Sequence, residues 1–401
     1  MNKYTCIFGG GGIRGLAYVG AMEALKKLNI ECDKYVGSSV GAIFAAFYAL
    51  GYTPDEAKNI MLDFNALMFK DINFGINAEF AFSKGDIFEN WIREIIEKIF
   101  YKEKYKKGEN PPVAFRDINK DLYVCSTDMA SNSKFTFSKQ TTPDFEIAKA
   151  IRISACFPGL MKPIEYDNKL LVDGDLAKNL PLWKCADDLV TPDSRILEYR
   201  LEGCSDCKNF KNPIDYFNEV YSTMSYFSTE QVVDLYKEQD KIDYIVIDTK
   251  DVLILDFQMP AEKREQLSQN GYDTTMKYFT ETLVEKKKKL LPLYTETLKM
   301  LKNLKISVKK GNAKKAKQTI FDYICTCSDD YMNMDFTFLE ELKKFKTEFL
   351  NKINEDKIFH LETINNKTEL NKIIQGLIEK CDNIITELQT DIEHFSAMKR
   401  N

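Results

Sequence analysis

The feature that most constrains this chain is a serine between two glycines, where one predicted strand ends and a helix begins. Residues 34–41 read Lys-Tyr-Val-Gly-Ser-Ser-Val-Gly and run directly into the apolar residues 42–50. The spacing Gly37-x-Ser39-x-Gly41 is typical of a nucleophile elbow, a sharp strand-to-helix turn that lifts a serine hydroxyl clear of the sheet edge. The glycines suit such a turn because a side chain there would clash. The alternative is that Ser39 only caps an ordinary helix.

A glycine-rich loop precedes the elbow. A predicted strand at residues 4–8 leads into Gly-Gly-Gly-Gly-Ile-Arg-Gly over residues 9–15, and a helical pattern follows to about residue 28. Glycines between a strand and a helix let backbone N–H groups point at an anion. The loop could hold an oxyanion. It also fits the dinucleotide pattern Gly-x-Gly-x-x-Gly, for which Glu31 or Asp33 would supply the acidic partner.

An acid–glycine pair marks the end of a third predicted strand. Residues 169–172 are followed by Asp173-Gly174-Asp175. In an α/β sheet, ligand and catalytic sites gather at strand ends, although an Asp-Gly turn is also common without any function. Asp173 is therefore a candidate base for the serine. If Asp175 lies close, this second carboxylate would raise the pKa of Asp173.

The histidine content favours a carboxylate base. His360 and His394 are the only two histidines, and both fall on predicted amphipathic helices near the C-terminus. A Ser-His-Asp triad would need one of them to reach Ser39. A free aspartate is a weak base, but it can take the hydroxyl proton directly through a short hydrogen bond in a dry site. We therefore expect a Ser39–Asp173 pair, with amides of the glycine loop holding the oxyanion.

The glycine loop, the elbow and the acid–glycine pair, in this order, resemble the patatin-like phospholipase family over about residues 3–183, and more loosely to 285. The resemblance implies a three-layer α/β/α sandwich and hydrolysis of phospholipid or lysophospholipid acyl esters, with no metal or other cofactor in catalysis. Asp175 departs from the family, which more often has a small residue there. The implied roles are Ser39 as nucleophile, Asp173 as base with Gly174 in the acid motif, Gly10, Gly11 and Gly12 as oxyanion hole with Arg14 ordering that loop or stabilising charge, and Gly37 and Gly41 in the elbow.

The character of the chain changes after the lysines of residues 286–289. Strand signals become scarce from residue 290 onward, and apolar residues recur at alternating threes and fours, as in a coiled coil. We expect an acyl hydrolase domain over residues 1–285 and an all-helical domain over residues 290–401, which offers a surface for a homo-oligomer or a protein partner. The lysines would be a solvated face, or else an attraction to anionic lipid. The coiled-coil-like positions are Leu377, Cys381, Ile384, Leu388, Ile392 and Phe395.

The net charge and the hydropathy of the chain indicate which partners and which location to expect. Its formal net charge is −5, which gives no reason to expect nucleic acid as a partner. The N-terminus begins directly as a strand without a signal segment, and no apolar run approaches the ~20 residues that span a bilayer. We therefore expect a cytoplasmic protein that contacts phospholipid membranes peripherally.

The cysteines and one aromatic stretch each leave two interpretations. The ten cysteines are either reduced surface thiols or include a zinc site. The zinc candidates are Cys204, Cys207, Cys325 and Cys327.

Residues 64–82 are rich in phenylalanine and form either core or an apolar flap that meets lipid.

Two other functions stay open beside the acyl hydrolase. One is a dinucleotide-binding oxidoreductase that uses the glycine loop. The other is a scaffold that works through its helical C-terminal region and whose serine site is silent. The hydrolase interpretation is favoured because it alone explains the loop, the elbow and the acid–glycine pair together.

Overall fold

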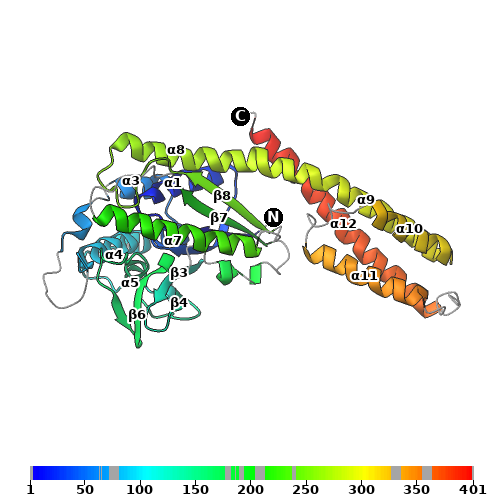
Figure 1. Cartoon of the computed structure of the whole chain (residues 1–401), viewed down its shortest axis with the longest axis horizontal. Coiled ribbons are helices and arrows are strands. Elements are labelled where there is room, and N and C mark those ends of the chain that lie inside the picture. The colour runs from blue at the N-terminus through cyan, green and yellow to red at the C-terminus, as the bar shows by residue number, and fades with distance from the viewer. Residues whose placement is uncertain are drawn as a thin grey trace. The chain divides into compact units, whose positions relative to one another are not determined.

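The chain divides into two compact units, which are described separately (Figure 1). Unit 1 comprises Met1–Lys237 and Lys241–Met276, and unit 2 comprises Glu238–Asp240 and Lys277–Asn401. The predicted boundary between residues 285 and 290 falls inside helix α9 (Leu283–Lys309). The computed structural model describes residues 3–62, 64, 66–71, 81–176, 182–185, 187–188, 194–203, 213–236, 241–326, 336–354 and 364–399.

Unit 1 is built on one eight-stranded mixed sheet. The strands are β1 (Lys3–Phe8), β2 (Cys32–Ser38), β3 (Asp121–Asp128), β4 (Ser133–Ser138), β5 (Ile164–Tyr166), β6 (Lys169–Asp173), β7 (Ser194–Glu202) and β8 (Ile242–Asp248). Their order is β5-β6-β3-β2-β1-β7-β8, with β4 paired to β3. The β3-β2-β1-β7-β8 portion is parallel, whereas β4 and β6 run antiparallel to β3. The parallel portion directs the carboxyl ends of β1 and β2 to the same edge.

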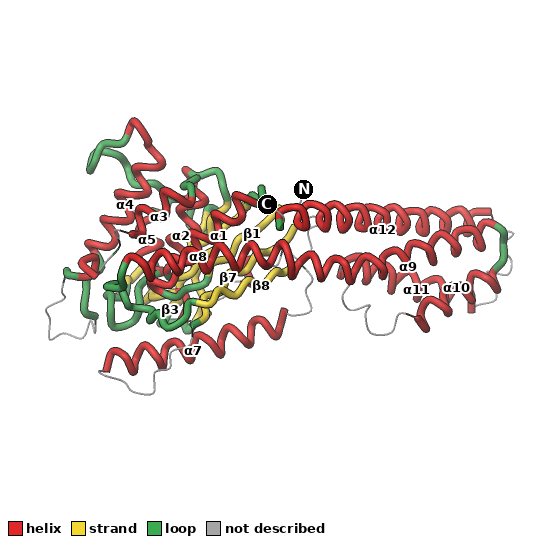
Figure 2. The backbone as a smooth tube through the Cα atoms, turned by 90° about the horizontal axis from the view of Figure 1, so that it is seen from above, coloured by secondary structure: helices red, strands yellow, loops and turns green. Residues whose placement is uncertain are grey.

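Helices cover both faces of this sheet (Figure 2). On one face the Phe8 ring packs against Tyr18 and Tyr199. On the other face Ile7 lies in a core cluster with Val232. Neighbouring residues of a strand point to opposite faces, so Ile7 and Phe8 enter different cores. The predicted three-layer α/β/α sandwich is confirmed. The helices of unit 1 are α1 (Ala17–Lys27), α2 (Val40–Ala49), α3 (Pro54–Leu62), α4 (Asp86–Tyr101), α5 (Ile147–Ser154), α7 (Pro213–Tyr236) and α8 (Ala261–Lys277).

Unit 2 is helical, as predicted for the C-terminal region. After a π-helical turn at Tyr278–Thr282, it contains α9, α10 (Ala313–Thr326), α11 (Phe336–Asn354) and α12 (Ile364–Met398). Leu377, Cys381 and Leu388 of α12 are buried with Leu301 and Leu304 of α9, so the predicted apolar seam packs within this unit. Within the described part of the chain, none of the helices combines the length and apolar character needed to cross a bilayer.

The aromatic stretch at residues 64–82 is divided between core and surface where it is described, and Leu67 is 61% exposed. Phe64 and Phe69 are buried, and their rings pack with Phe88 and Phe257. Phe82 is 55% exposed, and residues 72–80 lie outside the described residues. The core interpretation therefore fits Phe64 and Phe69.

The expectation of reduced surface thiols is wrong for the cysteines that are described. Cys6 and Cys32 form a disulfide between the neighbouring strands β1 and β2. The free thiols are buried because they fill apolar positions of the cores, as free cysteines commonly do. Of the zinc candidates, Cys204, Cys207 and Cys327 lie outside the described residues, and the residues that are described contain no cluster fit to hold a metal ion. The buried free thiols are Cys125, Cys156, Cys185 and Cys381.

Candidate active site

The strand–turn–helix predicted around Ser39 is present. Ser39 follows the last residue of β2 and precedes α2, with φ 52° and ψ −128°, a conformation that a side chain disfavours. Such strain persists where the surroundings hold the backbone, and it is frequent at functional sites. A Cβ atom on Gly37 would lie 2.3 Å from the carbonyl oxygen of Gly41, and one on Gly41 would lie 2.1 Å from that of Phe8. The turn therefore requires both glycines.

The structure brings Asp173 to this serine. Asp173 ends β6 and is completely buried, and the hydroxyl of Ser39 donates a hydrogen bond of 2.8 Å to its Oδ2 atom. Burial raises the pKa of Asp173 to about 7, although hydrogen bonds from the Asp175 amide, Ser39 and Tyr221 oppose the increase. A base with a pKa near neutrality can both accept and return a proton at physiological pH.

Two residues that hold this pair were not predicted. The amide of Ser39 donates to Oγ of Ser154 at 3.0 Å, and Ser154 in turn donates to the carbonyl of Cys125. The hydroxyl of Tyr221, on α7, lies 3.4 Å from Oδ1 of Asp173. Ser154 is the last residue of α5 and is buried, and a single serine at a helix end gives no signal of this role. Nothing in the local sequence marks Tyr221.

The glycine loop is fastened to the chain segment that follows β8. Gly11 and Gly12 have φ values of 147° and 57°, which favour glycine. The amide of Ile13 donates to the carbonyl of Ile254 at 3.0 Å, and Nε of Arg14 donates to that of Val252 at 2.6 Å. Arg14 is buried, and burial lowers the pKa of its guanidinium. This geometry fits the loop-ordering role expected for Arg14.

Asp175 contacts the same loop. The carboxyl group of Asp175 lies beside Gly10, and a Cβ atom added to Gly10 would come within 1.4 Å of its Oδ2 atom. The Gly10 amide donates a hydrogen bond to this carboxyl group. Gly10 is therefore engaged inside the protein, while the amides of Gly11 and Gly12 have no acceptor among the described residues. Burial, followed by the charge of Asp173, raises the pKa of Asp175 well above its usual range. The two carboxyl groups therefore resist being ionised together.

This geometry argues against a dinucleotide site. A pyrophosphate must approach the glycine backbone closely, but the Asp175 carboxyl group fills the space beside Gly10. The acidic candidates Glu31 and Asp33 lie at the amino end of β2, whereas Ser39 follows its carboxyl end. Ligands of open α/β sheets bind outside the carboxyl ends of the strands, so neither acid is positioned to hold a ribose.

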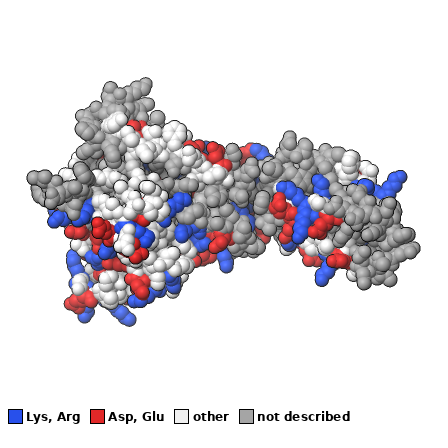
Figure 3. Space-filling model, turned by 60° about the horizontal axis from the view of Figure 1, so that its bottom comes forward, with Lys and Arg blue, Asp and Glu red and all other residues white. Residues whose placement is uncertain are grey.

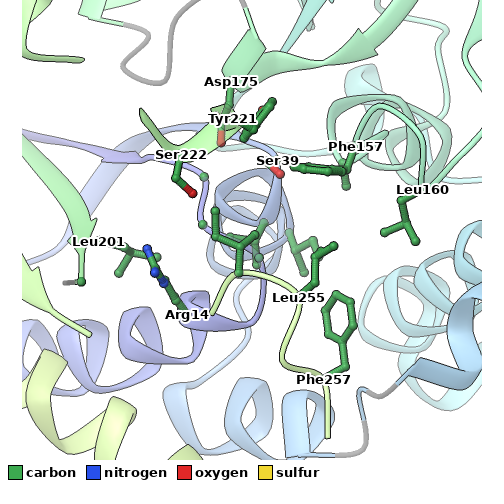
Figure 4. Close-up of a pocket in the computed structure, with 18 of the residues that line it drawn as sticks. Arg14, Ser39, Phe157, Leu160, Asp175, Leu201, Tyr221, Ser222, Leu255 and Phe257 are labelled. Atoms are coloured by element: carbon green, nitrogen blue, oxygen red, sulfur yellow. The ribbon is translucent and has the colours of Figure 1, made fainter. Parts of the chain in front are cut away.

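A cavity of about 480 Å³ opens over Ser39 (Figure 4). In this view Arg14 and Ser222 lie on one side of Ser39, and Phe157, Leu160 and Phe257 lie on the other. The cavity therefore has an apolar side and a more polar side, where Leu201 also lies beside Arg14. Further polar lining comes from Arg200, Glu202 and Asp248, and further apolar lining comes from Ile43, Phe64, Phe69, Phe88 and Met161.

A buried arginine that sequence reasoning missed fixes the apolar side. Arg264 of α8 donates hydrogen bonds to the carbonyl oxygens of Phe64 and Phe257, and also to those of Met61 and Leu62. A guanidinium can do this because its five N–H donors diverge in a fixed plane. Arg264 therefore holds two distant segments of the aromatic wall together.

The histidines take no part in the geometry described here. His394 lies on α12 of unit 2, and His360 lies outside the described residues. The hydroxyl of Ser39 has a carboxylate as its hydrogen-bond acceptor. These features together define an α/β protein with a nucleophile-elbow serine.

Comparison with known proteins assigns the family. Residues 6–185 match the family described as patatin-like phospholipase, and this part of the chain belongs to it. The family predicted from the three motifs is therefore confirmed, and membership supports a lipid hydrolase in general.

Relatives cover the chain to different extents. The uncharacterized protein YqhO of Bacillus subtilis is 27% identical over 66% of this chain and 94% of its own length. The probable lipid hydrolase 463L of Invertebrate iridescent virus 6 is 28% identical over 44% of this chain and 61% of its own length. The crystal structure of VipD from Legionella pneumophila is 15% identical, covers 99% of this chain and 92% of its own, and has a TM-score of 0.50, which supports the fold alone.

Proposed function

We propose that this chain releases fatty acids from phospholipids or lysophospholipids through Ser39 and Asp173. The observation that carries the proposal is the 2.8 Å hydrogen bond from the strained Ser39 to a fully buried carboxylate, at the floor of a largely apolar cavity. Burial keeps the pKa of Asp173 near 7, so the carboxylate can take the hydroxyl proton without a histidine.

The reaction follows from these positions. Oγ of Ser39 attacks the ester carbonyl carbon while its proton passes to Oδ2 of Asp173. The carbonyl oxygen becomes an oxyanion, which accepts hydrogen bonds from the amides of Gly11 and Gly12. The ester bond breaks, and Asp173 returns the proton to the leaving alkoxide, which leaves an acyl-serine. Water then attacks the acyl-serine while its proton passes to Asp173. The bond between the acyl group and Oγ of Ser39 breaks, Asp173 returns the proton to Oγ, and the fatty acid is released.

The two sides of the cavity suit the two ends of a phospholipid. The aromatic side, formed by residues such as Phe69 and Phe257, would receive the acyl chain, because burying its methylene groups is favourable. Arg14 lines the cavity, and its Nε donates to the carbonyl of Val252. The charge of Glu219 acts on its guanidinium, whose remaining N–H groups could donate to a phosphate. By contrast, Arg200 is already held by Glu202 and Glu230.

The test is fatty-acid release from mixed phospholipid vesicles in the presence of a chelator, measured by mass spectrometry. Wild type should release fatty acid, whereas Ser39→Ala and Asp173→Asn should not. Replacing both His360 and His394 by glutamine serves as the control and should leave the rate unchanged. Full activity of either site variant would overturn the Ser39–Asp173 assignment. If wild type neither releases fatty acid nor reacts with a fluorophosphonate at Ser39, the proposed function is overturned, and partner binding by the C-terminal region would then support the silent-scaffold alternative.

A further inference from the structure

Helix α7 exposes an unusual number of large apolar side chains. Residues 216, 220, 224 and 227 are spaced by three or four positions, which aligns them along one side of the helix. Leu235 lies on the same side but is separated from them by the exposed Gln231. Scattered exposed apolar residues are normal, whereas a continuous stripe marks an interaction site. We call the four aligned residues the α7 stripe: Tyr216 (57% exposed), Val220 (39%), Met224 (60%) and Phe227 (62%).

The opposite side of the same helix forms the cavity wall. Tyr221, Ser222 and Thr229 line the cavity, and Tyr221 also reaches Asp173. Tyr226 joins the two sides, because it lines the cavity, is 50% exposed, and has its ring 5.8 Å from that of Phe227. The apolar surface is therefore continuous from the substrate cavity to the outside of the molecule. Figure 2 shows α7 as the outermost helix on its side of the sheet.

The charged residues of α7 indicate which kind of lipid surface the helix can contact. The helix contains Asp215, Glu219, Glu230 and Asp234 but no lysine or arginine. Glu230 is paired with Arg200, but α7 offers no basic residue of the kind that anionic membranes attract, and the net charge of the chain is −5. On the face of the molecule in Figure 3, acidic and basic side chains are interspersed rather than gathered by sign. The apolar stripe rather than charge would therefore drive contact.

We propose that the α7 stripe is the surface by which unit 1 docks on a zwitterionic lipid surface. The helix would lie in the plane of the interface with its stripe at the boundary between headgroups and acyl chains. Tyr226 would then connect the lipid to the cavity. This inference rests on the proposed function, because it assigns the route by which a membrane lipid meets Ser39.

The binding test uses the full-length chain and phosphatidylcholine vesicles in a sedimentation assay. The double variant Met224→Ser/Phe227→Ser should partition at least about tenfold less onto vesicles, because each substitution removes the transfer free energy of a large side chain. Phe321→Ser on α10 is the matched control, since Phe321 is 61% exposed, and it should bind as wild type does. Replacing a third of the phosphatidylcholine by phosphatidylglycerol should weaken wild-type binding.

A second measurement separates docking from chemistry. Fluorophosphonate labelling of Ser39 and hydrolysis of a water-soluble short-chain ester should be the same in wild type and in the double variant, because neither substituted side chain lines the cavity. Unlabelled wild type would refute the proposed function, while the vesicle assay would still test the stripe. Absence of wild-type binding to phosphatidylcholine, equal binding of the double variant, or a change only in oligomeric state by light scattering would each overturn the docking proposal.

Discussion

The pH dependence of the Ser39–Asp173 pair gives the sharpest prediction. Burial raises the pKa of Asp173 from an ordinary 3.8 to about 7. The ionised, basic form is then about 1% of the enzyme at pH 5 and about 90% at pH 8. Because only this form accepts the proton of Ser39, reactivity should increase about ninetyfold between these pH values. With the ordinary pKa, the same change in pH would alter reactivity by less than about 10%.

The assay is the rate of fluorophosphonate labelling of Ser39, since this reagent needs no vesicle and reports the nucleophile directly. A histidine would titrate in the same range, so the matched control replaces both His360 and His394 by glutamine. The control should keep the midpoint near pH 7. A flat profile between pH 5 and 8 would refute the assignment to a buried carboxylate. A midpoint that disappears in the double-histidine variant would assign the base to the C-terminal region.

The neighbouring Asp175 permits a further check on the same profile. Burial and the charge of Asp173 both favour the protonated form of Asp175, so Asp175→Asn should remove little charge from the site. The midpoint should therefore shift by less than about half a pH unit. A decrease of more than about one unit would mean that Asp175 is ionised in wild type and that its charge raises the pKa of Asp173.

Three further predictions concern Asp173, Tyr221 and Arg264. Folding raises the pKa of Asp173, so the folded state resists its ionisation. Between pH 4 and 7 the unfolding free energy of the wild type should therefore fall by up to about 4 kcal/mol relative to that of Asp173→Asn, and it should fall no further above pH 7. If urea denaturation gave the same difference between the two proteins at every pH, this prediction would be contradicted. Tyr221→Phe removes a donor to the Asp173 carboxylate, so the labelling midpoint should rise by a fraction of a unit; a fall would oppose that role. Arg264→Lys should lower the unfolding free energy by about 2 kcal/mol or more, because buried carbonyls lose their donors; an unchanged urea midpoint would refute it.

The parts of the fold that were predictable rest on short sequence patterns. The elbow occupies five consecutive residues, and its glycines are required by contacts between Gly37, Gly41 and the adjacent strand β1. The strands predicted before the glycine loop, before Ser39 and before Gly174 correspond to β1, β2 and β6. Asp173 was found because its pattern lies at a strand end, where the sheet itself brings it close to Ser39.

The remaining site residues could not be predicted, because their roles depend on contacts between distant segments. Tyr221 reaches Asp173 from a helix whose own sequence shows only an apolar pattern. Arg264 bonds to carbonyl oxygens, and any residue presents a carbonyl, so no side-chain pattern records the contact. The engagement of Gly10 by Asp175 likewise joins segments that are far apart in the chain. Of the three predicted oxyanion donors, only the amides of Gly11 and Gly12 are then without an acceptor among the described residues.

The strength of the base and the access of the lipid depend on the same helix. Asp173 is a useful base only while it stays dry, since water around the carboxylate would return its pKa towards 3.8. Tyr221 of α7 covers it, and the Tyr221 ring packs 4.6 Å from that of Phe157. If α7 lifted to admit substrate, the catalytic pair would lose the burial that activates it. The docking stripe is therefore better explained as a fixed surface beside the cavity than as the outside of an opening lid, and lipid would enter past Tyr226 while Tyr221 stays over Asp173.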